Sequence, residues 1–140
     1  MDIVHGSCVS IDDQGLLILG GSGSGKSSLA LSLMALGAIL VADDRVVLNW
    51  DGNQLVASAP DTLTGRIEAR GIGILKARSA ASVAVSQVLD MEQSETDRLP
   101  EKRTISLLNV SLPLLLRVEN PHFPSMLLQL MKAGRDDSTL

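Results

Sequence analysis

The chain has 140 residues, of which 45% are hydrophobic and 20% charged, and its formal net charge is −4. This length and apolar content predict one domain with its own core, spanning residues 1–140. The acidic balance and the single Trp, single Phe and absence of Tyr argue against nucleic acid as a partner, because the chain offers neither a basic field nor stacking surfaces.

Cysteine usage and hydropathy indicate the expected compartment. The single cysteine, Cys8, cannot form an intramolecular disulfide or a multi-cysteine zinc site, and we expect it to be a small buried hydrophobe. We find no signal-peptide pattern and no apolar run that approaches the length of a membrane span. These features predict a cytoplasmic protein without a membrane partner.

The first 60 residues predict several strands around one helix. Apolar and β-branched runs indicate strands over 3–11, 16–20, 38–42 and 45–50, with turns at 12–15 and 51–53. Leu29, Leu33 and Leu36 recur at helical spacing, which predicts a helix over 26–37 that ends at Gly37. The order strand, helix, strand implies a right-handed crossover.

The second half gives a less regular pattern. Residues 62–77 combine charges with glycines and are expected to form a structured loop. Strands are predicted over 83–89 and 105–118, with a mobile polar stretch at 92–103 between them. Pro124 suits the first turn of a helix within 121–131, and residues 135–140 are predicted to form a flexible tail. Together these elements predict a single α/β domain with a mixed β-sheet.

A glycine-rich motif follows the strand at 16–20. Residues 20–27, GGSGSGKS, match the Walker A (P-loop) pattern G-x-x-x-x-G-K-[ST] between a predicted strand and a predicted helix. The glycines allow backbone N–H groups to surround phosphate oxygens, while Lys26 reaches the β- and γ-phosphates and Ser27 binds Mg²⁺. The expected nucleotide-binding residues are Gly20, Gly21, Ser22, Gly23, Ser24, Gly25, Lys26, Ser27 and Ser28. The alternative is a glycine-rich turn with an exposed lysine.

Two adjacent acids, Asp43 and Asp44, end the strand that follows the helix. The crossover brings both carboxylates beside the motif. One carboxylate can hold Mg²⁺ and the other can orient or deprotonate an incoming hydroxyl, with the division between them open. The alternative is a solvated turn. Arg45 is expected to be a structural partner of these acids rather than a catalyst.

Several spaced elements together resemble the HPr kinase/phosphorylase family, bacterial enzymes that phosphorylate a serine of the phosphocarrier protein HPr. The elements are His5-Gly6, the motif at 20–27, Ala42-Asp43-Asp44, the segment IEARGIGI at 67–74 and the segment DRLP at 97–100. The resemblance spans residues 5–118 and corresponds to the family's catalytic domain without the N-terminal domain of longer members. It implies a P-loop α/β fold related to the HPr kinase and phosphoenolpyruvate carboxykinase type.

The same resemblance implies roles for individual residues. It assigns catalysis to His5, Lys26, Asp44 and Arg98, with Asp44 as the general base, and metal binding to Ser27 and Glu68. With Asp44 as the base, Asp43 is the expected further metal ligand. It implies ATP and Mg²⁺ as cofactors, and HPr as the protein substrate in the regulation of the phosphotransferase system and carbon metabolism. A homo-oligomer, a hexamer in the family, is also implied.

The chain departs from the family pattern at three places. Ser28 stands where the family usually has glutamate, and Gly21 where it usually has aspartate. Residues 112–118, LPLLLRV, should resemble the family's IPVRPGR, an element used for dephosphorylation; Arg117 remains, but the other arginine and the Pro-Gly step are missing. The resemblance therefore favours the kinase reaction and leaves the phosphorylase reaction open.

Two further functions stay open. One is a nucleotide-sensing module that binds without efficient turnover, and the less favoured one is a GTPase or small-molecule kinase. His122 has no partner at a motif spacing and is not assigned a function. An apolar stripe on the last predicted helix is assigned to the core or to a subunit interface; it comprises Met126, Leu127, Leu130 and Met131.

Overall fold

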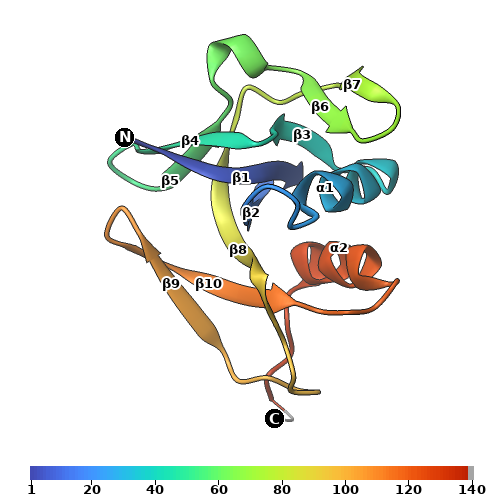
Figure 1. Cartoon of the computed structure of the whole chain (residues 1–140). Coiled ribbons are helices and arrows are strands. Elements are labelled where there is room, and N and C mark those ends of the chain that lie inside the picture. The colour runs from blue at the N-terminus through green and yellow to red at the C-terminus, as the bar shows by residue number, and fades with distance from the viewer. Residues whose placement is uncertain (139–140) are drawn as a thin grey trace.

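The computed structural model describes residues 1–138, which form ten strands, two α-helices and one 3₁₀ turn (Figure 1). The elements in chain order are β1 (Asp2–Ile11), β2 (Gln14–Leu19), α1 (Lys26–Ala35), β3 (Ile39–Ala42), β4 (Arg45–Trp50), β5 (Leu55–Ser58), η1 (Asp61–Leu63), β6 (Arg66–Ala69), β7 (Gly73–Lys76), β8 (Ser82–Ser94), β9 (Arg103–Leu107), β10 (Val110–Arg117) and α2 (Phe123–Ala133). The mixed α/β architecture predicted from the sequence is confirmed.

Five strands close into a ring. β1 pairs with β2 and β4, β4 pairs with β5, β5 pairs with β8, and β8 returns to pair with β2. The β2–β8 pairing is parallel and the other four are antiparallel. Gly15 lies at the closing point, where a Cβ atom would approach the Ala84 carbonyl oxygen to 2.8 Å. The ring therefore requires glycine at that position.

The remaining elements extend this ring. β3 pairs with β1 beyond the end of the β1–β4 pairing, and β10 pairs with the far end of β8 and with β9. Figure 1 shows α1 and α2 together on one side of the strands, with the β6–β7 hairpin above α1. Because β3 and β4 both pair with β1, the two residues between them, Asp43 and Asp44, lie against the middle of β1.

Two hydrophobic clusters form the core. The first lies within the strand ring and includes Cys8, Leu17, Val46, Leu48 and Val88. The second lies between the strands and the two helices; it includes Val9, Leu16, Leu33, Leu89, Phe123, Leu127 and Met131. Cys8 is fully buried, as predicted, and burial raises the pKa of its thiol to about 12.

The segment 62–77 is not the loop that we predicted from its charges and glycines. It forms the η1 turn and the antiparallel β6–β7 hairpin. Along β6 exposed and buried side chains alternate, and Ile67 and Ala69 face inward. Gly71 and Gly73 have positive φ angles, 96° and 135°, which let the chain reverse between the strands. The glycines therefore mark a hairpin turn rather than an irregular segment.

The second half of the chain differs from the prediction in two further places. β8 continues to Ser94 and β9 begins at Arg103, so strands occupy both ends of the stretch expected to be mobile. The single strand predicted over 105–118 is a hairpin, whose turn residues Leu108 and Asn109 have φ angles of 49° and 63°. The turn was missed because it contains no glycine or proline.

The last described residues contact the body of the domain. α2 has Pro124 in its first turn, as predicted; along its apolar stripe Leu127 and Met131 are buried while Met126 is exposed. The Asp137 carboxylate forms an ion pair with the Lys102 ammonium at 3.1 Å. The predicted flexible tail thus has an anchored part up to residue 138, and residues 139–140 lie outside the described chain. In the described part, neither helix has the length and apolar character needed to cross a membrane.

Candidate functional site

The glycine-rich motif forms the connection between β2 and α1. Gly23 and Gly25 have φ angles of 82° and 93°, and the Ser24 N–H donates to the Gly21 carbonyl at 3.2 Å. Within the described residues, the N-terminus of α1 has no side-chain cap and no acidic residue in its first turn. Its first N–H groups lack intrahelical partners and carry partial positive charge. This geometry suits an anion at the start of α1.

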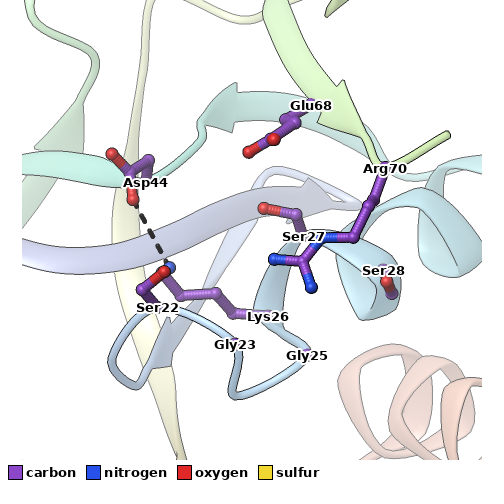
Figure 2. Close-up of a pocket in the computed structure, with 9 residues that line it drawn as sticks. All are labelled: Ser22, Gly23, Gly25, Lys26, Ser27, Ser28, Asp44, Glu68 and Arg70. Carbon is purple, nitrogen blue, oxygen red and sulfur yellow. Dashed lines mark hydrogen bonds and ion pairs between the residues drawn. The ribbon is translucent and has the colours of Figure 1, made fainter. Parts of the chain in front are cut away.

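A cavity of about 220 Å³ opens beside this loop (Figure 2). Its lining residues are Ser22, Gly23, Gly25, Lys26, Ser27, Ser28, Asp44, Glu68 and Arg70. Six of them belong to the predicted nucleotide-binding set. Gly20, Gly21 and Ser24 lie in the loop but do not line the cavity. A Cβ atom on Gly20 would lie 2.4 Å from the Ser24 Oγ atom, so Gly20 and Ser24 pack against each other inside the loop.

Asp43 is a buried carboxylate that accepts hydrogen bonds from three donors. Its Oδ1 atom accepts from the Ser7 hydroxyl at 2.7 Å and from the Ser27 hydroxyl at 2.6 Å, and its Oδ2 atom accepts from the Glu68 N–H at 3.2 Å. The residue is only 7% exposed. These bonds compensate the desolvation of the charge and join β1, α1, β6 and the β3–β4 turn.

Asp44 has a contrasting environment. Its φ angle is 68°, in the left-handed region that aspartate adopts more often than most residues other than glycine. Its side chain is 62% exposed and forms an ion pair at 3.5 Å with Lys26, whose side chain is 6% exposed. In Figure 2 a dashed line marks this pair, which joins the start of α1 to the turn between β3 and β4. Lys26 is thus a buried cation that faces the cavity with one long ion pair.

Glu68 and Arg70 complete the wall opposite the loop. Both extend from β6 and its turn, and in Figure 2 the Arg70 guanidinium points toward Ser27. The Glu68 N–H to Asp43 hydrogen bond fixes the position of β6 relative to the acidic turn. The cavity therefore combines backbone N–H groups, two cationic side chains and two carboxylates.

The structure brings together some of the residues predicted for catalysis and metal binding, but not all of them. Lys26, Ser27, Asp44 and Glu68 line the cavity, and Asp43 lies directly behind Ser27. His5 is exposed on β1 beside Arg45, outside the cavity.

Two arginines also lie apart from the cavity. Arg98 lines a different cavity, between the segment 95–100 and α2. Arg45 donates its backbone N–H to the Asp43 carbonyl at 2.8 Å, but among residues 1–138 its side chain forms no ion pair with the acids. Arg45 is therefore a partner of Asp43 through its backbone N–H group.

Sequence reasoning did not assign a role to three residues at this site. Arg70 belongs to the segment quoted for the resemblance, and its charge was the available signal. Ser7 and Glu92 bind Asp43 and the loop through contacts that span 36 and 71 residues. No local pattern marks either residue, because both contacts arise only when distant strands pair.

Comparison with known proteins identifies the family. A model described as the HPr Serine kinase C-terminal domain matches residues 1–118. The chain belongs to this family. The HPr kinase/phosphorylase of Prosthecochloris aestuarii is 35% identical over 130 residues, and that of Mycoplasmopsis pulmonis is 39% identical over 111 residues. These alignments cover 84% and 71% of this chain.

A solved structure supports the same assignment. The HPr(Ser) kinase/phosphatase from Coxiella burnetii superposes with a TM-score of 0.82 at 29% identity and covers 94% of this chain and 95% of that one. In contrast, the matches span only 38% and 36% of the lengths of the two curated relatives. The HPr kinase C-terminal fold is therefore shown for this chain, which accounts for little more than a third of each of those relatives.

Proposed function

We propose that this domain transfers the γ-phosphoryl group of ATP to a serine of the phosphocarrier protein HPr. The observation that carries the proposal is the arrangement of Lys26, Asp44 and the Asp43–Ser27 pair around one cavity at the start of α1. Membership of the HPr kinase family supports HPr as the substrate, because the relatives are named for it. Regulation of the phosphotransferase system and assembly into a hexamer belong to the same proposal.

The residues at the loop fit a magnesium nucleotide. The unpaired N–H groups at the start of α1 and the Lys26 ammonium suit the phosphate chain, whose negative charge they offset. Ser27, Asp43 and Glu68 offer the hydroxyl and carboxylate oxygens that Mg²⁺ prefers, and Mg²⁺ is commonly held by such oxygens together with substrate phosphates. Bound together, ATP and Mg²⁺ would supply the phosphoryl group and neutralise its charge.

The two aspartates are suited to different tasks. Both oxygens of Asp43 already accept hydrogen bonds, and one of the donors is the proposed metal ligand Ser27. Asp44 is exposed to the cavity and has one partner at 3.5 Å. We assign Asp43 to the metal, which it would hold through water while it orients Ser27, and Asp44 to the general base that accepts the proton of the attacking serine. Most of the rate enhancement would come from positioning and charge neutralisation.

The catalytic roles of His5 and Arg98 remain part of the proposal as expectations from the family resemblance. His5 pairs with Arg45 across β1 and β4, and the Gly6 N–H next to it donates to the Asp44 carbonyl at 3.1 Å. His5 is therefore adjacent in sequence to the strand position that holds the proposed base. Arg98 lies on a segment followed by exposed Leu99, away from the cavity.

Transfer of labelled phosphate from ATP to purified HPr tests the proposal. Asp44→Asn removes the base, and we expect the transfer rate to fall by about 10²- to 10⁴-fold, the usual contribution of general base catalysis. Asp13→Asn is a matched control, because Asp13 is also exposed in a turn and also has a positive φ angle, 62°. The control should transfer at the natural rate.

Two results would contradict the proposal or narrow it. If the natural chain binds ATP but labels no serine of HPr, the domain is a nucleotide-binding module instead. If it labels a metabolite and ignores HPr, it is a small-molecule kinase. The phosphorylase direction needs a separate assay of phosphoserine-HPr with inorganic phosphate; Arg117, the remaining arginine of the dephosphorylation element, is paired with Glu119 at 2.7 Å.

A further inference from the structure

The loop that binds the proposed nucleotide is supported by a distortion in β8. In the parallel β8–β10 pairing, Asp90 lies opposite Leu116, but the next β10 residue, Arg117, lies opposite Ser94. Residues 91–93 of β8 therefore have no partner in β10 and form a bulge. On the other side of β8, Asp90 pairs with Leu19, the last residue of β2 before the loop. The bulge thus begins where the phosphate-binding loop begins.

The Asp90 carboxylate fixes the shape of this bulge. Its Oδ1 atom accepts from the Glu92 N–H at 2.8 Å, and its Oδ2 atom accepts from the Gln93 side-chain amide at 3.0 Å. Aspartate commonly stabilises a local turn in this way, by accepting from an N–H two residues ahead. The Asp90 carboxylate therefore holds the backbone at Glu92 in place.

Two side chains of the bulge contact the loop. Met91 is 8% exposed and packs beneath it, where a Cβ atom on Gly20 would lie 3.2 Å from the Met91 Cβ atom. The Gly21 N–H donates to the Glu92 Oε1 atom at 2.6 Å. This is a short, charge-assisted hydrogen bond to the peptide group that opens the loop. Glu92 does not line the cavity, so it contacts the loop without contacting the space for the ligand.

We propose that Glu92 is a positioning residue, which holds Gly21 so that the following N–H groups face the phosphates. Its negative charge does not favour an anionic ligand, so the benefit must come from the hydrogen bond. Because Gly21 lacks a Cβ atom, its backbone is less restricted than that of other residues. A Cβ atom at this position would lie 3.1 Å from the Glu92 Oε1 atom, which shows how closely Glu92 approaches the loop. A carboxylate on a neighbouring strand thus compensates for the flexibility of consecutive glycines. The inference rests on the proposed function only in naming the ligand.

Three variants separate the hydrogen bond from the charge. Glu92→Ala removes both, while Glu92→Gln keeps an oxygen that can accept from Gly21 and removes the charge. Glu101→Ala is the control, because Glu101 is exposed and does not line the cavity. Isothermal titration with ATP and Mg²⁺ should show the dissociation constant rising about five- to tenfold in Glu92→Ala, and staying within about twofold in Glu92→Gln and Glu101→Ala.

Hydrogen exchange of the loop amides gives a second readout that needs no nucleotide. The Gly21 amide should exchange about tenfold faster in Glu92→Ala than in the natural chain, and return to the natural rate in Glu92→Gln. Urea unfolding of the same variants should give unchanged midpoints, since Glu92 is exposed and lies outside the core clusters.

Two outcomes would overturn the inference. One is an unchanged Gly21 exchange rate in Glu92→Ala; the other is equal damage from Glu92→Gln and Glu92→Ala. Failure of the proposed function gives a different pattern. The natural chain would then transfer no phosphate to HPr, while the exchange rates of the Glu92 variants still followed the order expected here.

Discussion

The two faces of β1 bury polar atoms in different ways. Ser7 and Cys8 are adjacent, and both are fully buried. Cys8 lies in the apolar cluster inside the strand ring, whereas the Ser7 hydroxyl donates to Asp43 on the side of the candidate site. A buried thiol needs no partner when it stays neutral, but a buried carboxylate needs donors from several elements. β1 thus separates an apolar core from the hydrogen-bond network of the Asp43 carboxylate.

Removal of the carboxylate should disturb the charged side most. Asp43→Ala leaves the Ser7 hydroxyl and the Glu68 N–H without their acceptor. We expect the free energy of unfolding to fall by about 2–3 kcal/mol, the cost of unsatisfied buried donors. Urea unfolding measures the change, with Asp61→Ala on the exposed η1 turn as the control. An effect below about 0.5 kcal/mol would show that water replaces the network.

The buried Cys8 thiol on the apolar side of β1 should make the free energy of unfolding depend on pH. Burial raises the pKa of Cys8 from 9.0 to about 12, so between these values the unfolded chain loses a proton that the folded chain keeps. Its contribution to stability is complete below pH 9.0 and is lost as the pH rises toward 12. The slope should be about 1.4 kcal/mol per pH unit.

Comparison of the natural chain with Cys8→Ala isolates this contribution from other groups that titrate in the same range. The alanine variant is expected to lose stability less steeply between pH 9 and pH 11. Its absolute stability will differ because of the lost packing, so the slopes and not the values are compared. Parallel slopes would mean that the thiol is accessible to hydroxide in the folded state.

A smaller effect is expected from Ser7→Ala. Asp43 would keep the Ser27 hydroxyl and the Glu68 N–H as donors, so the loss should be about 1 kcal/mol in urea unfolding. If ATP is the substrate, as proposed, its KM should rise less than twofold, since Ser7 does not line the cavity. Ser10→Ala, on the same strand and also buried, is the matched control. Equal losses in both variants would indicate general packing instead of a specific bond to Asp43.

Sequence reasoning succeeded where the signal was local. The motif at 20–27 and the turns at 12–15 and 51–53 follow from glycine and aspartate patterns, and the structure has a strand–loop–helix connection and two hairpins at these positions. The acids at the end of β3 were also placed correctly next to the motif, because crossover geometry follows from the order of the elements.

Other features depended on contacts that no local pattern encodes. The closure of the ring depends on the pairing of β2 with β8, some 70 residues later, and Gly15 gave no sign of that role in the sequence. The β6–β7 hairpin was predicted to be a loop because each strand has only four residues and β7 shows no alternation of buried and exposed side chains. Glu92 could not be assigned from the sequence, because only the β2–β8 pairing brings it to its partner, Gly21.

The β2–β8 pairing also has a consequence for synthesis of the chain. Residues 15–19 leave the ribosome long before residues 85–90, where their partners in β8 lie. During that interval β2 has β1 as its neighbour, and its other edge is open. Folding of the ring must therefore wait for β8, and formation of such distant contacts is expected to be slow. A nascent chain halted before residue 85 should therefore aggregate more readily than the complete chain, because the open edge of β2 can pair with other chains.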